Sequence, residues 1–169
     1  MSVYRVKEDE MRFIWRDYDK FDKSVVEEWL DDEARRTTGI DGSFEELYRY
    51  WLDKSDTTVE NELWCKVVFR ADKAVAALLI GCHKGEFTLS EFIVDPMLRG
   101  KGIGTAVLTE LIKHSVYILG KDITFVKAVI FPDNEASKRA FEKSGFNYDS
   151  THPDGDSMYY VHRKELKQC

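Results

Sequence analysis

Residues 94–105 read VDPMLRGKGIGT, and this stretch decides both the fold and the first candidate site. A strand-like run ends at its start, and three alternating glycines stand where a long, apolar-faced helix is expected to begin. Glycines let the chain bend so that successive N–H groups point toward one spot, and a helix N-terminus adds partial positive charge. Arg99 and Lys101 add full positive charges. The stretch therefore predicts a site for a phosphate or pyrophosphate.

Spacing excludes two common phosphate loops. A Walker A loop needs G-x-x-x-x-G-K-[ST], and no glycine here is followed by lysine and then serine or threonine. A dinucleotide fingerprint would need glycine at Thr105 and a series of βαβ units. A glycine-rich helix start that binds no ligand remains an alternative at this point.

The pattern on either side of this stretch predicts an α+β fold. Before it, residues 63–71, 75–83 and 86–94 are strand-like runs with short polar connections, which predict an antiparallel meander. Further toward the N-terminus we expect a strand at 12–17, a helix at 24–30 and a second helix opened by a capping box at Ser43 and Glu46. After it we expect a helix, a strand, a helix and two strands, and these elements are residues 105–119, 125–130, 135–143, 146–149 and 158–162. The order βααβββαβαββ implies a mixed, mostly antiparallel sheet flanked by helices.

Composition favours one compact domain over residues 1–169. The chain has 169 residues, 43% of them apolar and 33% charged, and it contains no linker or repeat. Cys65, Cys82 and Cys169 show no pairing or zinc spacing, so we expect free thiols, no metal and a cytoplasmic location. The net charge is −6 with scattered basic residues, which argues against nucleic acid as a ligand. The apolar runs are too short for a membrane span, and the charged N-terminus does not resemble a signal peptide.

Arg99, Gly102 and Gly104 fit the R/Q-x-x-G-x-G/A signature of the GNAT superfamily of acyl-CoA-dependent N-acetyltransferases, and the chain resembles that family from about residue 63 onward. In the family this signature follows a strand, usually through V-x-P, and opens a helix. The same context is present here at residues 94–96.

A second family motif, N-x-x-A-x-x-x-Y-x-x-x-G-F, is matched less closely. Asn134, Gly145 and Phe146 fit, Ala136 stands one place early, and Phe141 replaces the tyrosine. In the family that tyrosine is commonly assigned as the general acid, so the departure leaves the leaving thiolate without its usual proton donor. Water or another hydroxyl is then needed, and Tyr148, Tyr159 and Tyr160 are the candidates.

The resemblance implies that the chain binds acetyl-CoA as a co-substrate. Backbone amides of residues 100–105 would hold the pyrophosphate, residues 92–94 would offer backbone groups to the pantetheine arm, and Asn134 would contact the cofactor. An N-cap role for Asn134 explains its position equally well. The implied cofactor-binding residues are Phe92, Ile93, Val94, Arg99, Gly100, Lys101, Gly102, Ile103, Gly104, Thr105 and Asn134. Residues 1–62 would form the acceptor side and residues 63–169 the acetyl-CoA-binding core.

Glu91 is the candidate general base, because partial burial among its apolar neighbours would raise its pKa toward neutrality. The alternative is a strand-surface glutamate in a salt bridge. The apolar phase slips between Leu89 and Phe92, and a β-bulge near Ser90 and Glu91 would explain the slip.

The expected reaction is direct transfer of acetyl to a primary amine in a ternary complex. We expect the amine to belong to a small cationic molecule, held by Asp31, Asp32 and Glu33 with help from Asp41. A longer acyl-CoA or an alcohol acceptor is not excluded. The alternative function is a non-catalytic CoA-binding or regulatory domain of the same fold, motivated by the missing tyrosine. A second copy of the chain is retained as a candidate partner.

Overall fold

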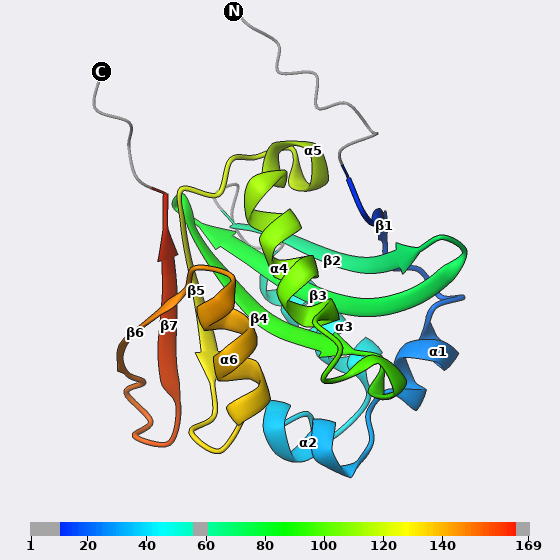
Figure 1. Ribbon diagram of the computed structural model, residues 1–169, viewed down its shortest axis with the longest axis horizontal. Coiled ribbons are helices and arrows are strands. Elements are labelled where there is room, and N and C mark those ends of the chain that lie inside the picture. Colours follow the sequence, from blue (N-terminus) through cyan, green and yellow to red (C-terminus); the bar gives the residue numbers. More distant parts are fainter. Residues whose placement is uncertain (1–10, 56–60, 165–169) are drawn as a thin grey trace, which may run out of the picture.

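The computed structural model describes residues 11–55 and 61–164 and contains one seven-stranded sheet with helices on both faces (Figure 1). The elements are β1 (Ile14–Asp17), α1 (Lys23–Glu28), α2 (Asp32–Thr38), α3 (Phe44–Ser55), β2 (Asn61–Arg70), β3 (Lys73–His83), β4 (Glu86–Val94), the 3₁₀ helix η2 (Pro96–Leu98), α4 (Ile103–Lys113), α5 (Ser115–Leu119), β5 (Phe125–Ile130), α6 (Glu135–Lys143), β6 (Asn147–Thr151) and β7 (Met158–Arg163). The strands run in the order β1-β2-β3-β4-β5-β7-β6, and only the β4–β5 pair is parallel. The predicted α+β class and mixed, mostly antiparallel sheet are confirmed.

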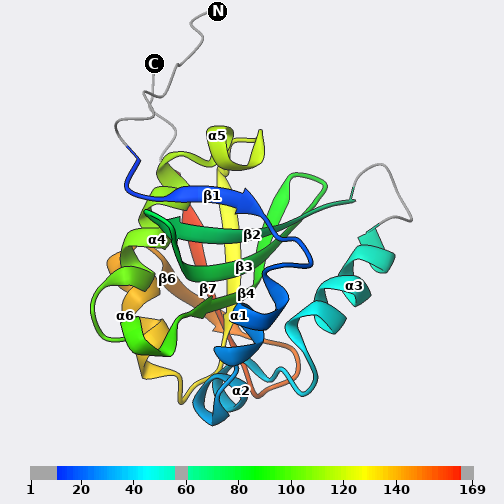
Figure 2. The same cartoon turned by 90° about the vertical axis from the view of Figure 1, so that its right-hand side faces the viewer.

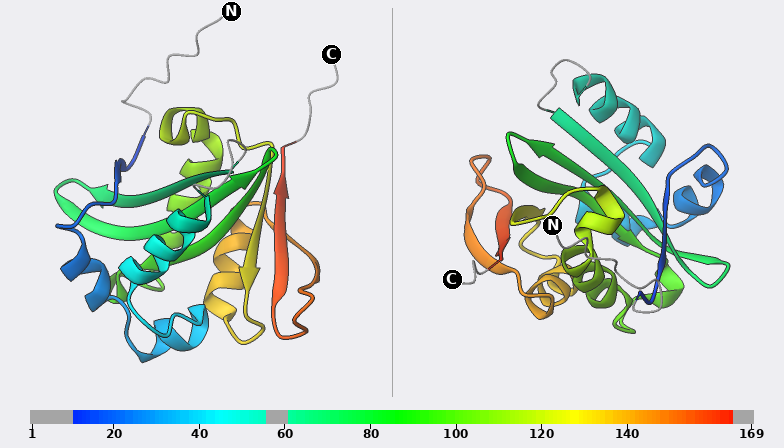
Figure 3. Two further views of the ribbon diagram at one scale, coloured as in Figure 1. Left: turned by 180° about the vertical axis from the view of Figure 1, so that it is seen from behind. Right: turned by 90° about the horizontal axis from the view of Figure 1, so that it is seen from above.

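The two faces of the sheet bury separate cores. Helices α4 and α6 cover one face, while α1 and α3 lie on the other face over β2, β3 and β4 (Figure 2). Strand β3 is buried on both faces, and its side chains alternate between the cores, with Leu78 under α4 and Leu79 on the α3 side. Helices α1, α2 and α3 leave β5, β7 and β6 uncovered on their own face (Figure 3).

The predicted β-bulge in β4 is confirmed. Glu91 pairs with Leu79 and Leu89 with Ile80, so Ser90 is the extra residue on β4. The bulge changes which face the odd-numbered residues occupy. Leu89 belongs to the core under α4, whereas Ile93 belongs to the core on the α3 side. Glu91 therefore shares the α3-side face with Ile93.

Strands β4 and β5 separate just beyond the bulge. Their parallel pairing runs from Phe87–Val126 to Leu89–Ala128 and stops there. The last residues of β4 keep their β3 partners, so the edge that faces β5 is free to bind something else. The two strands diverge at this end in Figure 1.

Two predicted elements need correction. The polar stretch at 31–42 contains the helix α2, because Asp31 caps its start and Gly39 ends it in the left-handed conformation with φ 74°. The predicted helix at 105–119 is two helices, because His114 ends α4 and precedes α5. The capping box at Ser43 and Glu46 is confirmed by the hydrogen bonds in both directions.

Cys65 and Cys82 are free and buried. The predictions about the N-terminal residues 1–10 and about Cys169 lie outside the described residues. Within the described ranges, none of the helices is both long enough and apolar enough to cross a bilayer.

Candidate active site

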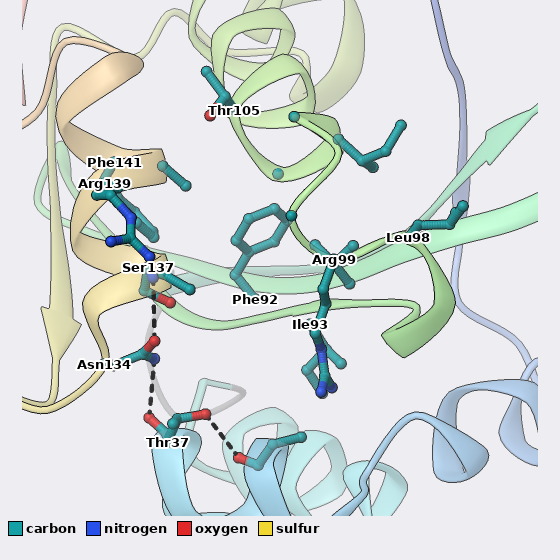
Figure 4. A pocket seen from close by; sticks show the side chains of 18 of the residues that line it. Thr37, Phe92, Ile93, Leu98, Arg99, Thr105, Asn134, Ser137, Arg139 and Phe141 are labelled. Carbon is teal, nitrogen blue, oxygen red and sulfur yellow. Dashed lines mark hydrogen bonds between the residues drawn. The ribbon is translucent and has the colours of Figure 1, made fainter.

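A pocket of about 370 Å³, which we call the glycine-loop pocket, lies beside the free edge of β4. Its walls come from the end of β4, the loop before α4, the first turn of α4, one face of α6 and part of α2 (Figure 4). Of the predicted cofactor residues, those that line it are Phe92, Ile93, Val94, Arg99, Gly100, Gly102, Ile103, Gly104, Thr105 and Asn134. Lys101 is exposed in the turn outside this lining.

The start of α4 is open to this pocket. Gly100 and Gly102 have φ values of 72° and 80°, a conformation in which a side chain is strained. Gly102 is the N-cap of α4, and in the described part of the protein no side chain accepts a hydrogen bond from the first N–H groups of this helix. By contrast, side-chain oxygens cap the starts of α2, α3 and α6. The first amides of α4 are therefore available to an anion in the pocket.

Gly104 has a different role from the other two glycines. A Cβ atom added to it would lie 3.6 Å from the Phe92 ring, 3.7 Å from Val94 and 3.8 Å from Ala140, all ordinary contact distances. Gly104 thus lies where α4 packs closely against β4 and α6, and an alanine would fit.

The charges around the pocket are arranged differently from the sequence prediction. The Arg99 Nη1 atom lies 2.9 Å from Asp31 Oδ2 and 3.4 Å from Glu33 Oε2, and Nη2 donates to the Trp29 carbonyl. On α6, Arg139 and Lys143 stand one turn apart and line the pocket. They form no ion pair with other residues in the described ranges, so they are the cations free to meet a phosphate.

Two carboxylates of the acidic cluster predicted to hold a cationic acceptor, Asp31 and Glu33, already have partners within the protein. Burial works to raise the pKa of Asp31, but the Ala34 N–H and Arg99, both bonded to it, lower that pKa overall. Glu33 lines the glycine-loop pocket and also meets Arg99. Asp31 caps a helix, and both Asp31 and Glu33 pair with Arg99 beside the cofactor loop, so their predicted role toward the acceptor stays a prediction.

Asn134 joins two helices at the pocket wall. Its Oδ1 accepts a hydrogen bond from the Ser137 N–H at 3.1 Å, which confirms the N-cap role. Its Nδ2 donates to the Thr37 carbonyl at 3.5 Å, so it also connects the start of α6 to the end of α2 (Figure 4).

A second pocket of about 400 Å³ adjoins the first, and we call it the Glu91 pocket. The residues shared by both linings are Thr37, Thr38, Phe92, Asn134, Ser137 and Phe141. Burial raises the pKa of Glu91 from its ordinary 4.5 to about 8. Glu91 forms no ion pair with any residue in the described ranges, so the salt-bridge alternative is not supported there.

Phe141 is buried and occupies the wall between the pockets. Its ring meets the Phe92 ring edge-on at 6.2 Å and the Phe146 ring edge-on at 4.9 Å. Among the three tyrosines considered as proton donors, Tyr160 is in the α4-side core, Tyr148 is half exposed on the edge strand, and Tyr159 lines the Glu91 pocket.

Sequence reasoning missed most of the Glu91 pocket. Its further walls include Trp51 of α3, Lys127 of β5, Phe131 just after β5, and His152 and Tyr159 of the last hairpin. Alternation in residues 125–130 separates Lys127 from the buried Val126 and Ala128. That pattern could have shown that Lys127 faces away from the α4-side core, but not that it lies near Glu91.

The combination defines a class of protein. An uncapped helix start and two free cations face a pocket beside an unpaired strand edge, and a carboxyl group of raised pKa faces the adjoining pocket. This is the arrangement expected of an enzyme that holds an acyl-CoA thioester next to a nucleophilic acceptor. In the described ranges, no group of three or more His, Cys, Asp or Glu residues is placed to hold a metal ion.

Comparison with known sequences defines the family. Residues 24–146 match the model of the Acetyltransferase (GNAT) family. A Bacillus subtilis (strain 168) protein, "Uncharacterized N-acetyltransferase YfmK", is 31% identical over 141 residues, which cover 79% of this chain and 84% of that protein. The chain belongs to the acetyltransferase (GNAT) family, and the predicted enzyme class, an acyl-CoA-dependent N-acetyltransferase, is confirmed.

Solved structures show the same fold. Aminoglycoside acetyltransferase AAC(6')-Ib in complex with coenzyme A and kanamycin is 16% identical with a TM-score of 0.69, covering 90% of this chain and 95% of that one. The spermidine N-acetyltransferase from Vibrio cholerae, in complex with CoA and spermine, is 14% identical with a TM-score of 0.67, again covering 90% and 95%.

Proposed function

We propose that the protein transfers the acetyl group of acetyl-CoA to a primary amine of a small molecule, by direct attack in a ternary complex. The observation that carries the proposal is that the glycine-loop pocket and the Glu91 pocket share one wall, around Phe92 and Phe141. The thioester would lie at this wall, because pantetheine bound along the free edge of β4 leads there from the start of α4. Solved relatives of the same fold contain CoA together with amine compounds, which supports this class of substrate.

Different groups of the protein would contact the pyrophosphate and the pantetheine arm of the cofactor. Amides from Gly100 to Thr105 would hold the pyrophosphate, and Arg139 and Lys143 would neutralise phosphate charge. Residues 92–94 would pair with the pantetheine amides, because their backbone on that edge has no strand partner beyond Leu89. Arg99 would act indirectly, since its guanidinium ties α2 to the loop.

Glu91 would supply the base. An amine arrives mostly as ammonium at neutral pH, and it attacks the carbonyl carbon only after it loses a proton. The ionised Glu91 would accept that proton, the N–C bond would form, and the C–S bond would break to release the CoA thiolate. A group with a pKa of about 8 is well matched to this transfer. Phe141 has no hydroxyl, so the thiolate would take its proton from water or from a hydroxyl such as that of Tyr159.

We also propose that residues 1–169 form one domain in which both halves build the site. The core over residues 63–169 would carry acetyl-CoA, and the helices before it would enclose the acceptor. The division is not strict, because Thr37 and Thr38 of α2 line both pockets.

The test is a panel of amines with acetyl-CoA, in which free thiol release and the acetylated product are both measured. Turnover that needs an amine and produces an amide supports the proposal. Binding of acetyl-CoA without turnover on any amine would contradict it and favour the non-catalytic alternative. Replacing acetyl-CoA with longer acyl-CoAs and amines with alcohols in the same assay tests the two remaining enzyme alternatives.

A further inference from the structure

Lys127 lines the Glu91 pocket and has no carboxylate partner among residues 11–55 and 61–164. Its neighbours in β5, Val126 and Ala128, face the α4-side core, so Lys127 lies on the opposite face of the sheet. It is partly buried, and its Nζ lies 5.5 Å from the centre of the Tyr159 ring. It forms no ion pair with any carboxylate in the described ranges, although the chain has 31 acidic and 25 basic residues.

The other titratable groups that line this pocket do not balance that charge. Glu91 has a pKa of about 8, so it is largely neutral at pH 7 in the free protein. The His152 Nδ1 lies 3.0 Å from an oxygen of the Asp154 carboxylate, so that carboxylate would balance a positive charge on the imidazole ring. The remaining titratable side chain in this lining is that of Tyr159. The pocket is therefore electropositive near pH 7 on a protein whose net charge is −6.

Aromatic side chains form much of the remaining wall. Trp51 comes from α3, Phe131 follows β5, and Tyr159 lies on β7 with the His152 ring 4.8 Å from its own. Strands β5 and β7 are neighbours in the part of the sheet that α1, α2 and α3 leave uncovered (Figure 3). Such walls stabilise an apolar or planar group.

We propose that the acceptor is a primary amine that also carries an anionic group, a carboxylate or a phosphate, on an apolar body, and that Lys127 binds this anionic group. The inference rests on the proposed function and names the acceptor class for the same site. The amine would lie at Glu91 and the apolar body against the aromatic wall. Because Lys127 aligns with Thr88 and the bulge shortens the path to Glu91, the two residues stand roughly 7 Å apart along the strands. A small amino acid or amino phosphate spans such a gap between two long side chains.

The experiment measures kcat/KM for matched pairs of acceptors. One arm compares aromatic and ω-amino acids with the amines that lack only the carboxylate, such as tyrosine with tyramine and 5-aminopentanoate with pentylamine. A second arm compares phosphoethanolamine with ethanolamine, which separates phosphate from carboxylate. Cadaverine and spermidine represent polycations. The same set is measured with Lys127→Gln, with Lys127→Glu and with the control Lys20→Glu, which makes the same charge change at an exposed residue outside the pocket.

We expect the anionic member to be preferred by about tenfold or more in at least one arm, mainly through KM. Lys127→Gln should remove this preference, because kcat/KM should fall much further for the anionic member than for the member that lacks the anionic group. Lys127→Glu should turn the preference toward diamines, whereas Lys20→Glu should keep the wild-type preference. A purely structural role for Lys127 would instead lower kcat/KM equally for both members of a pair.

Equal or better turnover of the members without an anionic group, or of the polycations, by the wild-type protein overturns this inference while the acetyltransferase function stands. An absence of thiol release with every amine overturns the proposed function instead. In that case calorimetric binding of the same pairs to the CoA-loaded protein decides the inference, since loss of the anionic preference in Lys127→Gln is required there too.

Discussion

The two pockets that meet at Phe92 offer different chemical groups for recognition. The glycine-loop pocket offers mainly backbone: the amides at the start of α4 and the free edge of β4. The Glu91 pocket offers side chains: one carboxyl group, one ammonium group and several aromatic rings. Backbone recognition depends on the path of the chain and changes little with side-chain identity, whereas side-chain recognition changes with single substitutions. The proposed site would thus combine a cofactor half fixed by the fold with an acceptor half open to variation.

The largest expected effect comes from a substitution in the glycine-loop pocket, where backbone groups are proposed to bind acetyl-CoA. Gly102→Glu should remove measurable binding of acetyl-CoA, a loss of more than about 100-fold, because it strains a residue at φ 80° and places negative charge among the amides meant for phosphate. Calorimetry on the folded variant measures this. Gly85→Glu is the matched control, since Gly85 has φ 82°, lies in the β3–β4 turn and has nothing within 4 Å of its added Cβ. Equal affinity of the two variants for acetyl-CoA would show that the pyrophosphate does not bind at the start of α4.

A milder change sharpens the same point. Gly104→Ala adds a Cβ at ordinary contact distances from Phe92, Val94 and Ala140, so the fold should be retained. We therefore expect acetyl-CoA affinity to fall by about tenfold at most, far less than in Gly102→Glu. A complete loss of binding would show that the pocket needs close approach at Gly104 as well.

The next effect comes from a substitution in the Glu91 pocket, where side chains are proposed to act on the acceptor. Glu91→Gln should lower kcat about 100-fold or more and leave acetyl-CoA affinity within about twofold, because a base acts on the amine. In the wild type, kcat/KM should rise with pH through about 8 as Glu91 ionises, and the variant should lose this limb. Lys127, His152 and Tyr159 also line the pocket. The pH profile is therefore measured with acceptors of different amine pKa, so that the rise in kcat/KM can be assigned to one group. An unchanged rate and pH profile would leave Glu91 a structural residue.

The difference between the halves also explains what the sequence could and could not predict. The glycine loop is continuous in the chain, so its residues alone predicted a helix start and a candidate anion site near residues 99–105, where the structure has the start of α4 and a pocket. The bulge at Ser90 was predictable too, because it leaves a slip in the apolar phase of one strand.

Side-chain partners from separate elements were not predictable in this way. The pairing of Arg99 with Asp31 joins two loops 68 residues apart. The meeting of Lys127 and Glu91 in one pocket depends on the β4–β5 register, which no local pattern reveals. Helix α2 was missed because it is short and polar, although its cap at Asp31 and its stop at Gly39 are local signals.

A smaller effect concerns the stability cost of Glu91. Its pKa is raised in the folded protein, so the folded state holds a proton that the unfolded state releases. The free energy of unfolding should therefore fall as pH rises from about 4.5 to about 8 and change no further from this group above that window. Glu91→Gln removes this term and should be more stable than the wild type at pH 9 by up to roughly 5 kcal/mol, but not at pH 4. Urea unfolding at the two pH values measures the difference, and an equal difference at both would contradict the raised pKa.

The smallest effect concerns Phe141, which belongs to both pockets. Its ring is buried against Phe92 and Phe146, and its position is that of the tyrosine in the family motif. Phe141→Tyr adds only an oxygen at the wall, so the fold should be retained with a loss of about 1 kcal/mol if the hydroxyl finds no partner. If protonation of the thiolate limits turnover, the new hydroxyl should raise kcat a few-fold. It should also reduce the solvent kinetic isotope effect on kcat. Phe141→Leu is the matched control, because it also alters packing but adds no proton donor. A rate that is the same in Phe141→Tyr and the wild type would show that the thiolate departs without help, and that the acceptor half, through Glu91, sets the rate.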